Sequence, residues 1–310
     1  MNGMLLAAGR GERMEPLSSL IPKPALEVLG RPLLASALDH LVQAGCSPIV
    51  VNLHRHPEAV ARAARSAAPP GVELSFSHEP ELLGSAGGIG AARHLFGAGP
   101  LLAANADVWA RLDLAPLLAR ARPDGAVLGL LPHPDPDRWS AVELGEGGVV
   151  RRIVPAGGTT VGTPYLFTGF QILGESVVAR LPSAPADIGP VWGALMRRGS
   201  LYGVPLEGSW REAGTPGSYR ALVSALLAGA CWRHPGAQVA GGAEVRGSAV
   251  GADCAVADGA VVEDSILTAG ARVGEGVQLE RCVAAGQMEI AASYCGRDRL
   301  ILPWGEVALV

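Results

Sequence analysis

The sequence predicts an α/β protein with a mainly parallel sheet, followed by a short parallel β-helix. Between Gly3 and about Pro132, short continuous apolar runs alternate with stretches of helical spacing, a pattern typical of a parallel sheet covered on both faces. From Val239 to Leu279, aliphatic residues recur in steps of six or five, which is a hexapeptide period. We expect a linker at 233–236, between domains that span 1–232 and 237–310.

The first part alternates strands and helices. The predicted strands are MLLAA (4–8), PIVVNL (48–53), VELSFS (72–77) and PLLAANAD (100–107). The predicted helices are PLLASALDHLVQAG (32–45), PEAVARAARSAA (57–68) and GGIGAARHLF (87–96). Ligands of such sheets bind at the carboxyl ends of the strands, so the loops after MLLAA and PLLAANAD should meet at the binding edge.

The next part is richer in strands. The predicted strands are SAVEL (140–144), GVVRRIVP (148–155), PYLFTGFQIL (164–173) and SLYGVPL (200–206). The predicted helices are IGPVWGALMRRG (188–199) and TPGSYRALVSALLAG (215–229). The hexapeptide ladder follows, and a tail from Gln287 to Val310 is expected to break it, with LILPW (300–304) as a capping strand.

Composition indicates a globular protein. The chain has 310 residues, is 49% hydrophobic and carries a formal net charge of −4, which argues against a nucleic-acid partner. Its five cysteines show no CxxC spacing, so neither disulfides nor a zinc site is expected. The first residues lack a signal-peptide pattern, and no apolar run approaches the ~20 residues of a membrane span. We expect a cytoplasmic location and no membrane partner.

The stretch LLAAGRGERMEPLSSLIPKPAL, from Leu5 to Leu26, has the composition of an anion-binding loop. Gly9 and Gly11 follow the first strand, and Lys23 stands between two prolines. Backbone N–H groups of a glycine loop can point at phosphate oxygens, and Arg13 and Lys23 add positive charge. The segment therefore predicts a phosphate-binding loop.

Two common phosphate motifs are absent from this stretch. Met14 occupies the third glycine position of GxGxxG, and the pattern GxxxxGK[ST] does not occur. The alternative is a solvated basic loop. We favour that alternative for Arg10 alone, but not for the whole stretch.

The pattern L-A-A-G-x-G-x-R-M-x-P-L-[ST]-x-x-x-P-K-P-x-[LV]-x-V-x-G-x-P-L, matched from Leu6 to Leu33, resembles the signature of the sugar-phosphate nucleotidylyltransferases. The resemblance implies a Rossmann-like core whose glycine loop grips a nucleoside triphosphate. The implied nucleotide-binding residues are Leu6, Ala7, Ala8, Gly9 and Gly11. It also implies that Arg13 and Lys23 are catalytic and neutralise the phosphates that leave as pyrophosphate.

Two further segments resemble nucleotide-binding parts of the family. LLGSAGGI (82–89) resembles the second glycine loop, which receives the base and ribose, with Gly84, Ser85 and Gly88 as candidates. For any one of these residues, a glycine-rich helix start is an equally good explanation. NADVW resembles a strand end whose acid, Asp107, binds catalytic Mg²⁺, and Asn105 is counted with the nucleotide-binding residues. Asp107 could instead be an ordinary helix N-cap.

The last resemblances concern the sugar and the second metal ligand. FTGFQIL resembles the segment whose glycine, Gly169, approaches the sugar, and GSWREAGTPGSY resembles the segment that supplies the second magnesium ligand. Here the chain departs from the family, because Glu212 replaces an Asp. A lysine that usually holds the sugar phosphate is also missing, which leaves Arg152 or Arg151 as replacements. Arginine binds phosphate through a planar fork of N–H groups, so it is not an equivalent replacement for the missing lysine.

The resemblance implies transfer of a nucleotide from a nucleoside triphosphate to a sugar 1-phosphate, with Mg²⁺ as the cofactor. The domain layout is most similar to mannose-1-phosphate guanylyltransferases, and N-acetylmuramate-1-phosphate uridylyltransferases are a second possibility. The alternative is a catalytically weak regulatory paralogue that binds nucleotide sugar. The left-handed β-helix is expected to mediate homo-oligomer formation. It is too short for an acyltransferase and contains no histidine from Val239 onward.

Overall fold

The computed structural model describes residues 1–309 and separates into two compact units. The first unit contains Met1–Arg10 and Leu34–Trp210, and the second contains Gly11–Leu33 and the chain from Arg211 onward. The part of the signature from Gly11 to Leu33, called the signature segment below, therefore belongs to the same compact unit as the C-terminal β-helix.

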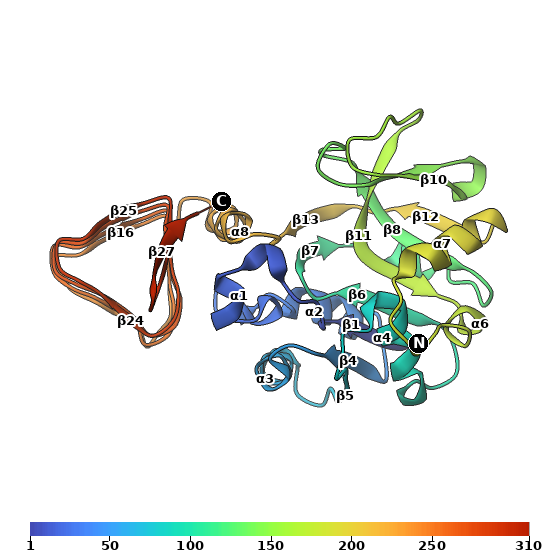
Figure 1. Ribbon diagram of the computed structural model, residues 1–310, viewed down its shortest axis with the longest axis horizontal. Helices are drawn as coiled ribbons and strands as arrows, with labels where there is room; N and C mark the ends of the chain where they lie inside the picture. Colours follow the sequence, from blue (N-terminus) through green and yellow to red (C-terminus); the bar gives the residue numbers. More distant parts are fainter. Residues whose placement is uncertain (310) are drawn as a thin grey trace. The chain divides into compact units, whose positions relative to one another are not determined.

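The first unit is built around a nine-stranded mixed sheet (Figure 1). The strands are β1 (Asn2–Leu6), β4 (Ile49–Leu53), β5 (Leu74–His78), β6 (Leu101–Asn105), β8 (Ala126–Pro132), β9 (Ala141–Leu144), β10 (Val150–Val154), β11 (Pro164–Leu173) and β12 (Leu201–Pro205). The order is β10-β9-β11-β6-β1-β4-β5, with β8 paired to β11 and β12 paired to β8. Strands β5, β4, β1 and β6 are parallel, whereas β11 is antiparallel to β6. The predicted α/β core is confirmed.

Helices flank this sheet. They are α2 (Ala35–Gln43), α3 (Pro57–Ala67), α4 (Gly84–Ala92), α5 (Ala115–Leu118), α6 (Glu175–Val178) and α7 (Ile188–Arg197), with the 3₁₀ turns η3 (Arg93–Leu95) and η4 (Glu146–Gly148). Strand β7 (Val108–Leu112) pairs with β13 (Gly208–Glu212) in a separate two-stranded sheet. The core uses the apolar strand residues that the sequence singled out, such as Met4, Val50 and Ala103, which are fully buried.

In the second unit, the signature segment forms short elements before α8. These are η1 (Glu12–Met14), α1 (Leu17–Leu20), η2 (Lys23–Ala25) and the hairpin strands β2 (Glu27–Val28) and β3 (Arg31–Pro32). Helix α8 (Pro216–Leu227) starts with a capping box. The Ser218 N–H donates to Thr215 Oγ1 at 3.2 Å, and the Thr215 N–H donates to Ser218 Oγ at 2.8 Å.

The β-helix is a triangular stack of three sheets, in which every strand except β27 pairs in parallel (Figure 1). One sheet contains β14 (Trp232–Arg233), β17 (Ala249–Val250), β20 (Ile266–Leu267), β23 (Val283–Ala284), β26 (Arg299–Leu302) and β27 (Gly305–Ala308). The second sheet contains β15 (Gln238–Val239), β18 (Ala255–Val256), β21 (Ala271–Val273) and β24 (Met288–Ile290). The third contains β16 (Glu244–Arg246), β19 (Val261–Glu263), β22 (Gln278–Glu280) and β25 (Cys295–Arg297). Stacked partners such as Val250 and Leu267 are 17 residues apart, so two steps of six and one of five make one coil.

The stack extends further than the sequence predicted. Strands β24, β25 and β26 continue the parallel pairing, and only β27 turns back antiparallel to β26. The expectation that the pattern breaks at Gln287 is therefore wrong. At Gly296 a Cβ would lie 2.8 Å from Cε1 of Tyr294, so an aromatic ring fills the place that an aliphatic side chain takes in earlier coils. Because Tyr294 takes the place of an aliphatic residue, the hexapeptide period cannot be recognised in this part of the sequence.

Small polar side chains join the coils at one corner. The Ser265 N–H donates to Oγ of Ser248, and the Cys282 N–H donates to Oγ of Ser265, both at 2.9 Å. All three residues are buried. The two serine hydroxyls therefore satisfy backbone N–H groups that would otherwise be buried without a hydrogen-bond partner.

Candidate active site

The glycine loop begins at the carboxyl end of β1, a strand that lies between two parallel neighbours, β4 and β6. Ala7 and Ala8 are buried, whereas Gly9 is exposed and a Cβ built on it would meet nothing within 4 Å. Gly11 has a left-handed φ of 66°, and its carbonyl accepts a hydrogen bond from Ser18 Oγ at 3.0 Å. Gly9 therefore leaves an open approach to the backbone, while Gly11 is required by the turn.

A buried hydrogen-bond network connects this loop to the neighbouring strand ends. The Ala7 N–H donates to Asn52 Oδ1 at 2.7 Å, and Asn52 Nδ2 donates to Glu79 Oε1 at 2.7 Å. Glu79 Oε2 accepts from the Leu83 N–H at 2.9 Å. Sequence reasoning missed this network. The available signal was the amide of Asn52 inside an otherwise apolar strand.

The second glycine loop forms the start of α4, and its small residues have packing roles. Gly84 has a φ of 70°, and a Cβ there would lie 2.7 Å from the Ala186 carbonyl oxygen. Oγ of Ser85 accepts a hydrogen bond from the Ile188 N–H at 2.9 Å. A Cβ at Gly88 would lie 2.6 Å from Oε1 of Glu79. These contacts explain the small side chains, and nucleotide binding by Gly84, Ser85 and Gly88 stays a prediction.

Two predicted site residues lie side by side where β11 passes β6. Gly169 has a φ of 89°, and a Cβ there would lie 3.1 Å from Cβ of Asn105. The register of β11 against β8 is irregular between Phe167 and Gln171. Gly169 therefore lets the irregular strand approach the end of β6 closely.

Asp107 lies in the turn between β6 and β7 and is half-buried. The preceding Ala106 N–H donates to the Leu6 carbonyl at 3.0 Å, which holds this turn beside the start of the glycine loop. A strand rather than a helix follows, so Asp107 is not a helix N-cap.

In the second unit, Glu212 forms an ion pair with Arg13. Arg13 Nη2 lies 2.7 Å from Glu212 Oε1, and the side chain of Glu212 is only 10% exposed. A Cβ at Gly214 would lie 3.0 Å from the Glu212 carboxyl atoms, so the glycine leaves room for the longer acid. The extra methylene of Glu relative to Asp is thus accommodated locally.

The remaining candidate cations differ in their surroundings. Lys23 begins η2 and is 8% exposed, which is rare for a lysine. Arg152 lies opposite Glu143 across β10 and β9, and its Nη1 is 3.4 Å from Glu143 Oε2. Oε1 of Glu143 also accepts the Val161 N–H at 2.6 Å. Arg152 is thus already paired with an acid.

The donor chemistry of the two predicted metal ligands fits magnesium, because Asp107 and Glu212 offer the carboxylate oxygens that this hard cation takes. Within residues 1–309, no group of three or more His, Cys, Asp or Glu side chains is arranged to hold a metal ion. In the same residues, every helix is too short or too polar to cross a bilayer.

Comparison with known proteins identifies the class that this fold and loop define. Residues 2–229 match the nucleotidyl transferase family, and residues 232–299 match the GlmU-like C-terminal hexapeptide domain. The chain therefore belongs to the nucleotidyl transferase family.

Among relatives, a mannose-1-phosphate guanylyltransferase catalytic subunit beta from Drosophila pseudoobscura pseudoobscura is 29% identical over 219 residues. That match covers 69% of this chain and 59% of the relative, so the chain spans less than two thirds of its length. An N-acetylmuramate alpha-1-phosphate uridylyltransferase from Neisseria meningitidis is 33% identical over 226 residues, covering 69% of this chain and 94% of the relative.

A similar fold occurs in HddC from Yersinia pseudotuberculosis, with a TM-score of 0.62 and 20% sequence identity over 73% of this chain and 99% of HddC. HddC has also been crystallised with GMP-PN.

Proposed function

We propose that the protein transfers a nucleotidyl group from a nucleoside triphosphate to a sugar 1-phosphate and releases pyrophosphate. The observation that carries the proposal is the open backbone at Gly9, at the carboxyl end of the central strand, in a chain of this family. A loop of this kind presents N–H groups to phosphate oxygens.

In the proposed reaction, a phosphate oxygen of the sugar 1-phosphate attacks the α-phosphorus of the triphosphate. The bond from this phosphorus to the bridging oxygen breaks, and pyrophosphate leaves. The protein contributes position and charge rather than covalent chemistry. Arg13 and Lys23 stabilise the negative charge that builds up on the leaving phosphates.

Asp107 and Glu212 would hold Mg²⁺, which when bound neutralises phosphate charge. Arg13 keeps the Glu212 carboxylate in place through its ion pair. We propose that the sugar 1-phosphate contacts Gly169 and Arg152. The nucleotide is proposed to contact the second glycine loop and Asn105.

We further propose a catalytic domain over 1–232 and a β-helix domain over 237–310, a cytoplasmic location, and self-association through the β-helix. The two groups of relatives suggest the first substrate pairs to test. These are GTP with mannose 1-phosphate, which we favour from the domain layout, and UTP with N-acetylmuramate 1-phosphate.

The test is pyrophosphate release by the purified protein, assayed over a matrix of triphosphates and sugar 1-phosphates with Mg²⁺. One pair should give release together with a nucleotide sugar of matching mass. Absence of release over the whole matrix would contradict the proposal.

A second candidate is a regulatory paralogue that binds nucleotide sugar without fast turnover. The pairing of Arg152 with Glu143 favours it, because that guanidinium is then less available to replace the missing lysine. Calorimetric binding of a nucleotide sugar, combined with absent pyrophosphate release, would identify this function.

A further inference from the structure

The signature segment Gly11–Leu33 shares its compact unit with α8 and the β-helix. We propose that Trp232, in the first coil, and Tyr219, in α8, are positioning residues that hold this segment, and with it Lys23, for nucleotidyl transfer. The inference rests on the proposed function, since the place of Lys23 matters only if it meets the leaving phosphates. It gives the C-terminal region a catalytic-support role in addition to the expected self-association.

The first contact is at the tip of the hairpin formed by β2 and β3. Its two turn residues, Leu29 and Gly30, have φ values of 49° and 84°, so both are left-handed, as in a type I′ turn. A Cβ at Gly30 would lie 2.7 Å from Cζ2 of Trp232. The indole therefore lies directly against the backbone of the turn, and only glycine fits there.

The second contact holds the other end of the same hairpin. Tyr219 is fully buried, and its hydroxyl donates to the Glu27 carbonyl at 2.5 Å. Burial raises the pKa of the Glu27 carboxyl, and the nearby imidazole of His234, together with the Gly30 N–H, opposes this shift. The hairpin is thus held by α8 at its start and by the first coil at its turn.

The backbone that connects Lys23 to the hairpin has little conformational freedom. Pro22 and Pro24 limit the backbone on both sides of the lysine. The Leu26 N–H closes the η2 turn onto the Lys23 carbonyl at 3.2 Å, and Leu26 is fully buried. A shift of Glu27 is therefore transmitted to Lys23 rather than absorbed by a loose loop.

A third contact lies on the other side of Lys23 in the sequence. Leu20, at the end of α1, packs against Gly286 of the β-helix, where a Cβ would lie 2.6 Å from Leu20 Cδ2. Gly286 lies between β23 and β24, far along the chain from Trp232. The β-helix thus contacts the segment both before and after the lysine.

The experiment compares Trp232→Ala with the matched control Trp304→Ala in the full-length protein. Trp304 is 60% exposed in the turn between β26 and β27. Hydrogen exchange of peptides from 11–33 should become faster in Trp232→Ala only. Its kcat should fall roughly 10-fold to 10²-fold, as expected when a reacting group is displaced by about 1 Å, with a smaller change in KM. Trp304→Ala should stay within about twofold of wild type.

Trp232→Phe should restore most of the kcat, because an aromatic ring again covers the turn. If Trp232→Ala does not fold, Tyr219→Phe, which removes only the hydroxyl bonded to Glu27, takes its place in both measurements. Unchanged exchange in 11–33, or faster exchange with unchanged kcat, would overturn the inference. Failure of the proposed function would be seen separately, as absent pyrophosphate release by the wild-type protein. The exchange rates would then still decide whether Trp232 holds the segment.

Discussion

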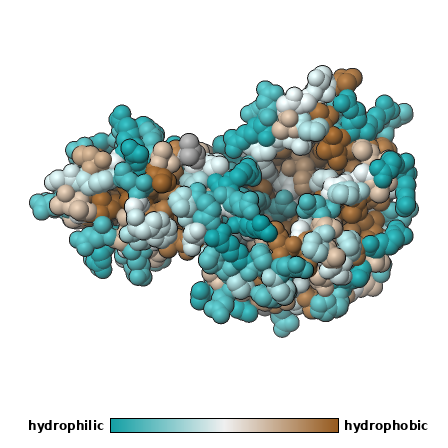
Figure 2. Space-filling view, viewed as in Figure 1, coloured by the Kyte–Doolittle hydropathy of each residue, from teal (hydrophilic) through white to brown (hydrophobic). Residues whose placement is uncertain are grey.

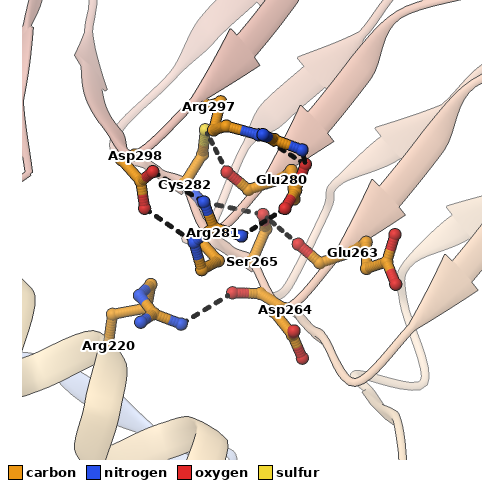
Figure 3. Close-up of polar contacts among 9 residues, drawn as sticks. All are labelled: Arg220, Glu263, Asp264, Ser265, Glu280, Arg281, Cys282, Arg297 and Asp298. Atoms are coloured by element: carbon orange, nitrogen blue, oxygen red, sulfur yellow. Dashed lines mark hydrogen bonds and ion pairs between the residues drawn. The ribbon is translucent and has the colours of Figure 1, made fainter.

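The α/β unit and the β-helix place their charged side chains in different ways. In the α/β unit, the ends of β1, β4 and β5 are joined through Asn52 and Glu79, which connect different elements inside the protein. In the β-helix, charged side chains lie on the outside and pair along the stack (Figure 3). Arg281 makes two hydrogen bonds of 2.7 Å to Asp298, which is 17 residues further on.

The difference follows from the topology of the two regions. Parallel strands of an α/β sheet end in loops of unrelated sequence, so different chemical groups converge at one edge. Each β-helix corner is repeated in the next coil, so a charge finds a partner directly above or below it. Arg297 pairs in this way with Glu280, its register partner in the preceding coil, while Arg281 pairs with Glu280 within one coil. Arg220 of α8 reaches the Asp264 carbonyl at 3.3 Å (Figure 3). Loops that converge at one sheet edge bring different chemical groups together and so favour a reactive site. Stacked coils bring opposite charges together and so favour their neutralisation.

The surfaces of the two regions are alike in hydropathy. On the face drawn in Figure 2, hydrophilic and hydrophobic residues are interspersed over both the α/β unit and the β-helix. Trp304 and Val307, which are 60% and 42% exposed, lie at the last hairpin of the stack.

The strongest test of the comparison is Asp107→Asn. Loss of one anionic ligand should lower turnover on the order of 10²–10³-fold, the scale found when one group that stabilises the transition state is removed. The melting temperature should stay near that of wild type, because Asp107 is only half-buried at the sheet edge. Wild-type turnover at limiting Mg²⁺ would show that Asp107 is not a ligand.

Lys23→Ala should lower kcat/KM by about 10²-fold, as for other lost transition-state charges. Arg10→Ala provides the matched loop variant and should have a smaller effect. Steady-state pyrophosphate release measures both. Equal and mild losses would reduce the loop to a generic basic surface.

Leu279→Ala should affect stability rather than chemistry. Leu279 is 1% exposed inside the β-helix, and truncating a buried leucine costs about 2–5 kcal/mol. Denaturant unfolding should show this loss, while kcat below the unfolding transition stays near the wild-type value. A collapse of kcat in the folded variant would contradict the separation of stability from chemistry in this coil.

Asn52→Ala should affect both stability and substrate binding. Removing the amide leaves the Ala7 N–H and Glu79 Oε1 without a partner, at a cost of about 1–3 kcal/mol per buried group. KM for the triphosphate should rise because both glycine loops lose their shared support. Asn52→Asp should be worse, since it places a second acid beside Glu79. Equal stability of the two variants would argue against the network.

The smallest effect concerns pH and the outer charges of the β-helix. Hydrogen bonding from Arg281 lowers the pKa of the Asp298 carboxyl, and Arg297 does the same for Glu280. Because the folded pKa is the lower one, the stabilisation is present above the ordinary carboxyl pKa and is lost as pH falls through the lowered value. The melting-temperature difference between wild type and Arg281→Ala should therefore shrink below about pH 4. A difference that does not change with pH would exclude this coupling.

Several features of this protein follow from local sequence patterns alone. The alternation of apolar runs gave much of the strand and helix order, although it missed β7 and β8. The step of six or five predicted the repeat that the structure folds into coils of 17 residues. Both patterns reflect side-chain spacing along one element. The signature from Leu6 to Leu33 likewise placed the glycine loop after β1. The end of the β-helix was missed, because Tyr294 fills the coil in place of an aliphatic residue.

Only the tertiary structure decided which distant residues meet. Glu79 against Gly88, Arg13 with Glu212, and Trp232 on Gly30 join elements whose contact no spacing rule encodes. Each contact depends on how whole elements pack, on the space left by a missing Cβ, and on the burial of a polar atom that must then find a partner. For that reason the sequence identified the small residues of the second glycine loop, whereas the fold supplied the packing reason for their size.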